Sequence, residues 1–572
     1  MSRAELQAAV QSLYHNTDSQ KREASNVWLE KWQRSEAAWL VCYEVLSSES
    51  CDLETCYFAA QTLRTKVLRD FEELPSETGF GLPETLLGLL SRHANAPNAV
   101  KTQLCLGIAA LVLHIPAAKW SGGGFLESME QFAAKHGQAG DVMGVILEVL
   151  TVVPQEVGTY QPSILPERRR QLQQEMNEAL PKALNLLSYW LGTSHEKFLA
   201  QTLEAFAAWL RLTSGSGLSA SMLNSVFSSG LVQMALHCLE QEGEPFYSAV
   251  DAMIELLYCT SDGGSPKAEM ASVVQTMVSG IMGLVPRFHV CMQQAVEDLK
   301  DSGVVVDSNA SEDYEEEAKA LARLFAEVGE AYSYLISEAS PQVLGPVEAL
   351  LEVSQYPDMQ VSSISFNFWH RMSNILSAGR RPHSLHWEGP VLSEQEAQQR
   401  ISSFAPAFER LVSSLCGRLQ YPKDWGELHG DEKYEFKDMR AAVGDLLLDA
   451  TDILGPDRTL QLVMAPLTEV STQVQSGGIF DWRKAESSIY CVRCIHRSAL
   501  EVKDGSILVS LFSSLPTLPR VVELDCTVAL MLGDYSHWLA HAASQNQCDS
   551  SLIVSAMHYI IRGMEFVSCH VL

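Results

Sequence analysis

The stretch that decides the fold is ETCYFAAQTLRTKV, from Glu54 to Val67. Its small and apolar residues recur at spacings of three and four, which places them on one face of an α-helix. These residues are Cys56, Ala60, Leu63 and Val67. The polar residues that lie off this face are Gln61, Arg64, Thr65 and Lys66. The stretch therefore predicts an amphipathic helix that packs through one face and leaves a polar edge open.

The same helical spacing recurs along the whole chain, whereas the alternating patterns of β-strands are hardly found. Further examples are LCLGIAALVLHI (104–115), VMGVILEVLTVV (142–153), FLAQTLEAFAAWLRL (198–212) and ALARLFAEVGEAYSYLI (320–336). Short linkers that contain Gly, Ser, Pro or Asp separate these segments, as in TSGSGLS (213–219) and TSDGGSPK (260–267). The chain is therefore predicted to be all-α.

The predicted helices come in pairs at intervals of roughly 40 to 50 residues, the period of HEAT and armadillo units. Each pair would pack only on its neighbours, so the chain can exceed the size limit of a single core. We predict an α-α superhelix, a HEAT- or armadillo-like solenoid of antiparallel helix pairs. The expected divisions are N-terminal repeats at 1–75, a second region at 76–240 and further repeats at 241–572, where the array ends within a repeat.

The bulk composition limits the kinds of partner. The 572 residues are 47% hydrophobic and 19% charged, with a formal net charge of −29. Such a negative surface repels phosphate backbones, so we expect no direct nucleic-acid binding and favour basic protein partners. Solubility alone is the alternative explanation of the charge.

The cysteines and the apolar runs indicate in which cellular compartment the protein is expected. The thirteen cysteines are scattered, which is typical of buried thiols in a reducing compartment. The most apolar run, Val142–Val153, contains Glu148 and is too short to span a bilayer. We therefore expect a soluble intracellular protein with no membrane partner.

Signals for catalysis are weak. The chain contains no GxxxxGKS or GxxxxGKT phosphate loop, no GxSxG elbow and no HExxH zinc helix. Cys491 and Cys494, followed by His496, form the nearest approach to a metal or redox cluster, but no second ligand pair follows at a suitable spacing. Neighbouring positions on a packed helix explain the pair better. We predict no enzyme activity, no cofactor and no metal.

Two other features have two interpretations each, and a third receives no functional role. Trp209, Trp369 and Trp538 follow amphipathic runs and fit an inter-helix core better than an aromatic ligand ladder. The acidic segment 301–320 is either a solvated helix start, where the helix dipole favours negative charge, or a loop that contacts a basic ligand. The triplet Arg168–Arg170 begins a predicted helix, and we assign it no cargo role.

Particular stretches resemble a known family. The segment Lys21–Val67, with the junction QRSEAAW at 33–39 and CYFAAQTL after it, resembles the importin-β N-terminal domain. The runs VKTQLCLGIAALVLHIPAAKW (100–120) and GVILEVLTVVPQEV (144–157) resemble the adjacent exportin and importin region. SISFNFWHRM (363–372) and YEFKDMRAAVGDLLLDATDILG (434–455) are similar to the transportin-SR branch, also called transportin 3 or Mtr10-like. The resemblance covers essentially the whole chain.

The resemblance implies a nuclear transport receptor that carries protein cargo through the nuclear pore, contacts nucleoporins and shuttles between cytoplasm and nucleus. It implies control by the small GTPase Ran in its GTP form, which the family grips partly with inner helices of the first repeats. The residues that match this role are Gln61, Thr65, Lys66 and Arg69. Cargo of this branch is typically rich in Arg-Ser segments, notably splicing factors.

The chain departs from this family in length. Members usually continue much further, and the basic helix that binds phosphorylated Arg-Ser segments lies in their C-terminal half. This chain stops at IIRGMEFVSCHVL (560–572), as a C-terminally truncated member would. The alternative function is a HEAT-repeat scaffold that holds protein complexes together without Ran.

Overall fold

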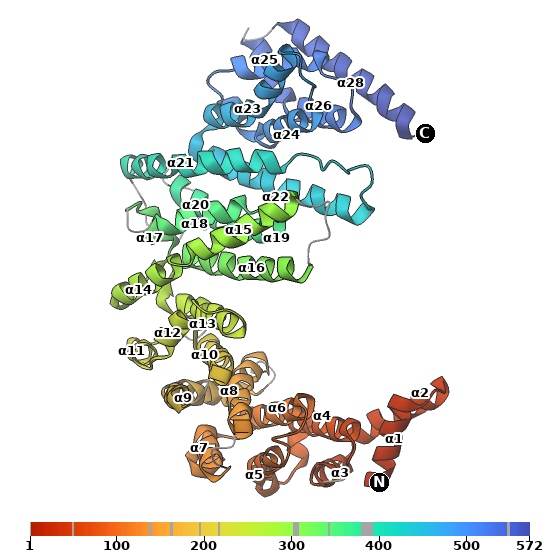
Figure 1. Ribbon diagram of the computed structural model, residues 1–572, viewed down its shortest axis with the longest axis vertical. Coiled ribbons are helices and arrows are strands. Elements are labelled where there is room, and N and C mark those ends of the chain that lie inside the picture. The colour runs from red at the N-terminus through yellow and green to blue at the C-terminus, as the bar shows by residue number, and fades with distance from the viewer. Residues whose placement is uncertain are drawn as a thin grey trace. The chain divides into compact units, whose positions relative to one another are not determined.

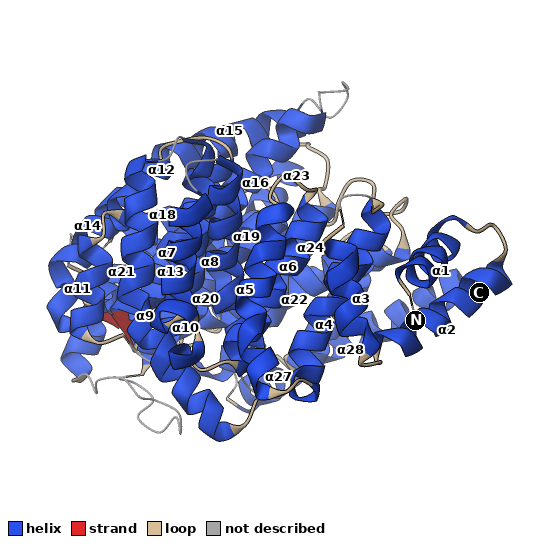
Figure 2. Cartoon of the chain, turned by 90° about the horizontal axis from the view of Figure 1, so that it is seen from below, coloured by secondary structure: helices blue, strands red, loops and turns tan. Residues whose placement is uncertain are grey.

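The computed structural model describes residues 2–571 except 49–50, 137–139, 161–163, 194–195, 215–217, 301–307, 341–343, 379–392 and 546–548. Helices dominate the described chain, as Figure 2 shows, and its strands form a single short hairpin. The predicted all-α class is confirmed. Contacts between residues group the chain into two compact units, Met1–Thr260 and Ser261–Leu572. The functional division at residues 75 and 240 stays a prediction.

The first unit contains a row of helices that stack on one another in chain order. This stacked row consists of α4 (Leu53–Asp70), α6 (Asn98–His114), α8 (Gly140–Tyr160), α10 (Leu199–Ser214) and α13 (Glu244–Thr260). A second row covers one side of it, and Figure 1 shows α3, α5 and α7 side by side along α4, α6 and α8. This covering row consists of α3 (Ala37–Leu46), α5 (Ser76–Arg92), α7 (Phe125–His136), α9 (Pro166–Thr193), α11 (Ala220–Ser228) and α12 (Leu231–Cys238). The pair α1 (Arg3–His15) and α2 (Ser19–Gln33) precedes both rows.

The second unit repeats the two-row plan. One row runs through α20 (Phe366–Ser377), α22 (Gly430–Leu454), α24 (Trp482–Cys494), α26 (Val522–Asp534) and α28 (Ser550–Val571). The other runs through α16 (Ser308–Ala331), α18 (Gly345–Gln355), α21 (Glu394–Arg418) and α23 (Pro456–Gln475). The remaining helices are α14 (Ala271–Met282), α15 (Val285–Lys300), α17 (Ser333–Ser337), α19 (Met359–Ser362), α25 (Ser506–Ser514) and α27 (Ser536–Ser544).

Short elements connect the helices. The strands β1 (Ser261–Asp262) and β2 (Ser265–Pro266) pair antiparallel, with Asp262 opposite Ser265. Gly263 and Gly264 form the turn between them with φ of 55° and 98°, which glycine adopts without strain. The 3₁₀ turns are η1 (Phe71–Glu73), η2 (Ala117–Lys119), η3 (Ser121–Gly123), η5 (Glu196–Phe198), η6 (Ala268–Met270), η8 (Ser363–Ser365), η9 (His496–Glu501) and η10 (Leu515–Thr517).

Hydrogen bonds reveal the repeat length directly. Partners in successive repeats lie 44 to 47 residues apart in the chain. These pairs include Gln7 with Asp52, Leu46 with His93, Leu68 with His114, and Arg211 with Glu255. In the second unit Arg440 bonds Glu486 at a separation of 46 residues. These separations fall within the predicted period of 40 to 50 residues, whereas Glu348 of α18 and its partner Arg410 of α21 lie 62 residues apart.

The core lies between the two rows of each unit. Trp209 and Trp369 are fully buried and Trp538 is 4% exposed, so their predicted place in the core is confirmed. Residues 301–307 of the acidic segment lie outside the described residues, and α16 begins directly after them at Ser308.

Within the described parts of the chain, two helical stretches are long and apolar enough to cross a bilayer, by length and composition alone. The first, Val142–Tyr160, corrects the expectation of a run too short to span, because α8 continues seven residues past Val153. This helix packs between α6 and α10 and is half buried. The second, Ala268–Glu297, comprises η6, α14 and α15, and its chain leaves the α-helix at Gly283 and Leu284. Packing between α6 and α10 accounts for the apolar character of the first stretch, whereas only 28% of the apolar window in the second is buried.

Candidate partner-binding surface

Helix α4 begins at a well-defined cap. Asp52 has an extended backbone, and its Oδ1 accepts a hydrogen bond from the Thr55 amide at 2.9 Å. Its Oδ2 accepts another from Gln7 Nε2 of α1 at 2.8 Å. A carboxylate at this position satisfies an orphan amide and favours the positive end of the helix dipole. The cap thus fixes both the start of α4 and its contact with α1.

One edge of α4 stays partly open to solvent. Gln61 and Thr65 are half-buried and Arg69 is exposed, and they follow one another at intervals of four residues. The Thr65 hydroxyl donates to the Gln61 carbonyl oxygen at 2.9 Å, a bond within one turn of the helix. We call Gln61, Thr65 and Arg69 the α4 edge. Their spacing forms a single polar line along the helix.

Lys66, which the resemblance places with these residues, turns inward. Its side chain is 1% exposed, and Nζ pairs with Asp70 at 3.0 Å and with Glu73. The ammonium also lies 5.5 Å from the centre of the Trp39 ring of α3. Burial opposes its charge, but hydrogen bonds to Glu73 and Asp70 outweigh that effect and raise the pKa of Lys66. The structure therefore uses Lys66 to join α4, η1 and α3.

The neighbouring Arg64 received no role from sequence reasoning. Its guanidinium reaches Glu156 of α8, with Nη2 and Oε2 3.2 Å apart. The two residues are 92 positions apart, about two repeats. Doubling the repeat length is the sequence signal that could have found this pair.

The contact between α4 and α6 depends on their C-terminal ends. His114 lies 3.2 Å from the Leu68 carbonyl oxygen through Nε2 and stacks on Phe71, with ring centres 4.9 Å apart. Burial, together with the nearby positive charge of Arg168, lowers the pKa of His114 and keeps its imidazole neutral. Arg168 of α9 donates to the carbonyl oxygens of Val112, Leu113 and Ile115 at 2.9 to 3.1 Å. The first arginine of the triplet is thus a side-chain cap of α6.

The other end of the stacked row is acidic. Glu204 of α10 and Glu244 of α13 are exposed, and Asp251 of α13 is half-buried. The side chains around Glu204 still shield its carboxylate partly from water, and this desolvation raises the pKa of Glu204; the like charges of Glu244 and Asp251 act in the same direction. Arg69 supplies an exposed positive charge at one end of the row, where Arg64 is already paired with Glu156, and these carboxylates supply negative charge to the other end. A partner surface of mixed charge would complement both ends.

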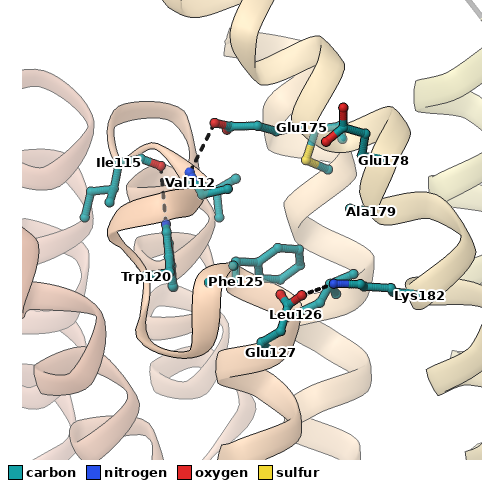
Figure 3. Close-up of a pocket in the computed structure, with 14 residues that line it drawn as sticks. Val112, Ile115, Trp120, Phe125, Leu126, Glu127, Glu175, Glu178, Ala179 and Lys182 are labelled. Atoms are coloured by element: carbon teal, nitrogen blue, oxygen red, sulfur yellow. Dashed lines mark hydrogen bonds and ion pairs between the residues drawn. The ribbon is translucent and has the colours of Figure 1, made fainter.

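A small cavity of about 120 Å³ lies apart from the α4 edge, where the end of α6 and the start of α7 meet α9 (Figure 3). The Trp120 indole donates to the Ile115 carbonyl oxygen at 3.3 Å, and Glu175 accepts from the Ala117 amide at 3.1 Å. Lys182 and Glu127 pair at its side. These contacts tie the α6–α7 connection to α9.

No group of three or more His, Cys, Asp and Glu residues that could hold a metal occurs among the described residues. Cys491 is fully buried, with its Sγ 3.6 Å from that of Cys416. Burial raises the pKa of Cys494 to about 11, which keeps it a thiol. His496 lies 2.9 Å from the Arg493 carbonyl oxygen. Each of these residues has a packing role in the helical core.

The row of stacked helices with its polar edge places the described chain in the α-solenoid class. Family models agree with this class. The importin-beta N-terminal domain matches residues 25–92, the Exportin 1-like protein family matches 97–253, and the transportin-3/importin-13 second TPR domain matches 312–387.

Relatives align over almost the entire chain. Transportin MOS14 of Arabidopsis thaliana is 35% identical over 98% of this chain and 54% of its own length. The mRNA transport regulator MTR10 of Saccharomyces cerevisiae is 24% identical over 98% of this chain and 53% of its own length. Human importin-13 is 23% identical over 94% of this chain and 52% of its own length. The chain therefore spans about half the length of these curated relatives.

A solved structure supports the fold. The chain titled "Importin13 cytosolic state" superposes with a TM-score of 0.64 at 17% identity, covering 90% of this chain and 54% of that one. The chain belongs to the importin-β family, in the branch of transportin 3, Mtr10 and importin-13.

Proposed function

We propose that this chain acts in a nuclear transport receptor that carries protein cargo through the nuclear pore under the control of Ran-GTP. Family membership and a two-row helical solenoid support this proposal. The observation that carries it is the α4 edge, because the importin-β N-terminal domain match at residues 25–92 contains this open polar line. The receptor works by binding, with no catalytic step of its own.

The α4 edge is the proposed contact for Ran in its GTP form. Gln61 and Thr65 offer hydrogen-bonding groups, and Arg69 offers an exposed cation that forms no ion pair within the described residues. Lys66 would support this edge without contacting Ran, because its ammonium is bound by Asp70 and Glu73. Its proposed contribution is to set the position of α4 against α3.

The proposed cargo is a basic protein segment, with Arg-Ser-rich splicing factors as the favoured class. The formal net charge of −29 and the carboxylates on α10 and α13 complement arginine side chains. Movement with such cargo requires contact with nucleoporins and shuttling between cytoplasm and nucleus. These partners and this localisation are part of the same proposal.

A nucleotide-state comparison tests the proposal. Immobilised Ran is loaded with a non-hydrolysable GTP analogue or with GDP, and the purified chain is passed over both. We expect retention on the GTP form alone. Equal retention on both forms, or none on either, would contradict the proposal and favour the scaffold alternative, in which partner binding ignores Ran.

A further inference from the structure

The ion pair between Arg64 and Glu156 joins two helices that are not neighbours in the stacked row. Arg64 lies on α4 and Glu156 on α8, and α6 contacts both helices between them. Their side chains are only 24% and 14% exposed, so solvent screens the pair less than it screens a surface ion pair. Other ion pairs in this row, such as Arg211 with Glu255, join adjacent helices.

The packing of α6 makes this long reach possible. At Gly107 the helix packs directly on the part of α4 that carries Arg64, since an added Cβ would lie in ordinary van der Waals contact with the Arg64 Cα, at 3.9 Å. On the other side of α6, the Thr102 hydroxyl donates to Glu148 of α8. Helix α8 therefore holds α6 through Glu148 and holds α4 through Glu156.

We propose that Arg64 and Glu156 form a clasp that fixes the spacing of three consecutive helices, α4, α6 and α8. With the clasp closed, α4, α6 and α8 move as one rigid group, and α4 and α8 do not rotate independently against α6. Solenoids bend by small rotations between neighbouring repeats, and a bond that skips a repeat restrains two of those rotations together. If a partner that binds the α4 edge shifts α4, the ion pair would then shift α8 as well. The geometry carries this inference whether or not Ran is that partner.

Hydrogen–deuterium exchange of the full chain tests the clasp, because it reads each helix separately. We expect Arg64→Gln to speed amide exchange in α8 and Glu156→Gln to speed it in α4, each by about fivefold. This factor corresponds to the loss of about 1 kcal/mol from an ion pair. The charge-swapped variant Arg64→Glu with Glu156→Arg should return both helices toward the wild-type rates. If a single variant proves poorly folded, the charge-swapped variant still tests the clasp, because it restores the ion pair in the opposite orientation.

The matched control is Arg211→Gln, which breaks the pair with Glu255 between the adjacent helices α10 and α13. We expect it to change exchange in those two helices and to leave α4 unchanged. The clasp is refuted if Arg64→Gln alters α4 alone while α8 keeps its wild-type rates. It is equally refuted if the charge-swapped variant exchanges as fast as the single variants.

Discussion

The guanidinium of Arg440 on α22 lies against the carboxylate of Glu486 on α24, with Nη2 2.8 Å from Oε1 and 3.0 Å from Oε2. Both side chains are buried, at 4% and 0% exposure. The guanidinium also lies 3.9 Å from the centre of the Tyr490 ring, and Thr527 donates to Glu486 at 2.5 Å. This cluster joins three successive repeats of the second unit.

Removal of one partner from this buried pair should be costly. We expect Arg440→Ala to lower the free energy of unfolding by about 3–5 kcal/mol, because it leaves the Glu486 carboxylate buried without its counter-charge. Arg458→Ala is the matched control, since Arg458 binds Glu409 through two nitrogens but is 46% exposed. Its cost should be much smaller, because water screens an exposed ion pair. Urea unfolding followed by circular dichroism measures both, and similar costs would refute the assigned burial.

Arg168 should contribute more to stability than its neighbour Arg170. We expect Arg168→Ala to cost about 2 kcal/mol, because it removes a charged donor from three carbonyl oxygens at the end of α6. Arg170 is exposed and bonds only the Pro166 carbonyl oxygen among the contacts of the described chain. Arg170→Ala should therefore leave the urea midpoint almost unchanged. A larger loss from Arg170→Ala would contradict the capping role of Arg168.

His114 should make the first unit sensitive to acid. Burial lowers its pKa below the ordinary 6.5, so the unfolded chain takes up this proton first as the pH falls. Stability from the neutral imidazole is therefore complete above pH 6.5 and is lost as the pH falls through the folded pKa. Between pH 7.5 and 5.5 the urea midpoint of the wild type should fall more than that of His114→Asn.

The control for this pH effect is His537→Asn, because His537 is exposed. This variant should follow the wild type at both pH values. The groups that face His114 are Leu68, Phe71, Arg168 and Glu72. An identical pH response in His114→Asn and the wild type would exclude His114 as the source.

Two variants of α4 separate partner binding from folding. We expect Arg69→Glu to weaken binding of Ran-GTP by at least about tenfold without lowering the unfolding midpoint, because Arg69 is an exposed cation. Lys66→Met should instead lower the midpoint, since it leaves Asp70 and Glu73 without their ammonium partner. Titration and thermal unfolding of both variants measure the difference. Full Ran affinity in Arg69→Glu would remove that residue from the proposed contact.

Periodicity in the sequence was enough to predict the helices and much of their packing. Apolar residues at spacings of three and four mark the buried faces, which is why Trp209, Trp369 and Trp538 could be placed in the core. The pairing of helices followed from the interval between them. The apolar spacing within a helix and the interval between successive helices both involve residues that are close in the chain.

The contacts around the candidate surface could not be predicted in this way. The partner of Lys66, Glu73, lies beyond the end of α4 in η1, where helical spacing no longer applies. Arg168 caps carbonyl groups 53 to 56 residues earlier, and Arg64 reaches 92 residues forward. Such pairs need the exact repeat length and the close approach of α4 and α6, and only the folded structure supplies these.

The central claim is best tested by titrating the chain with Ran bound to a non-hydrolysable GTP analogue and, separately, with Ran bound to GDP. The proposal predicts tighter binding of the GTP form by about a hundredfold, as expected for a nucleotide-controlled receptor. Equal affinities for the two forms would contradict it.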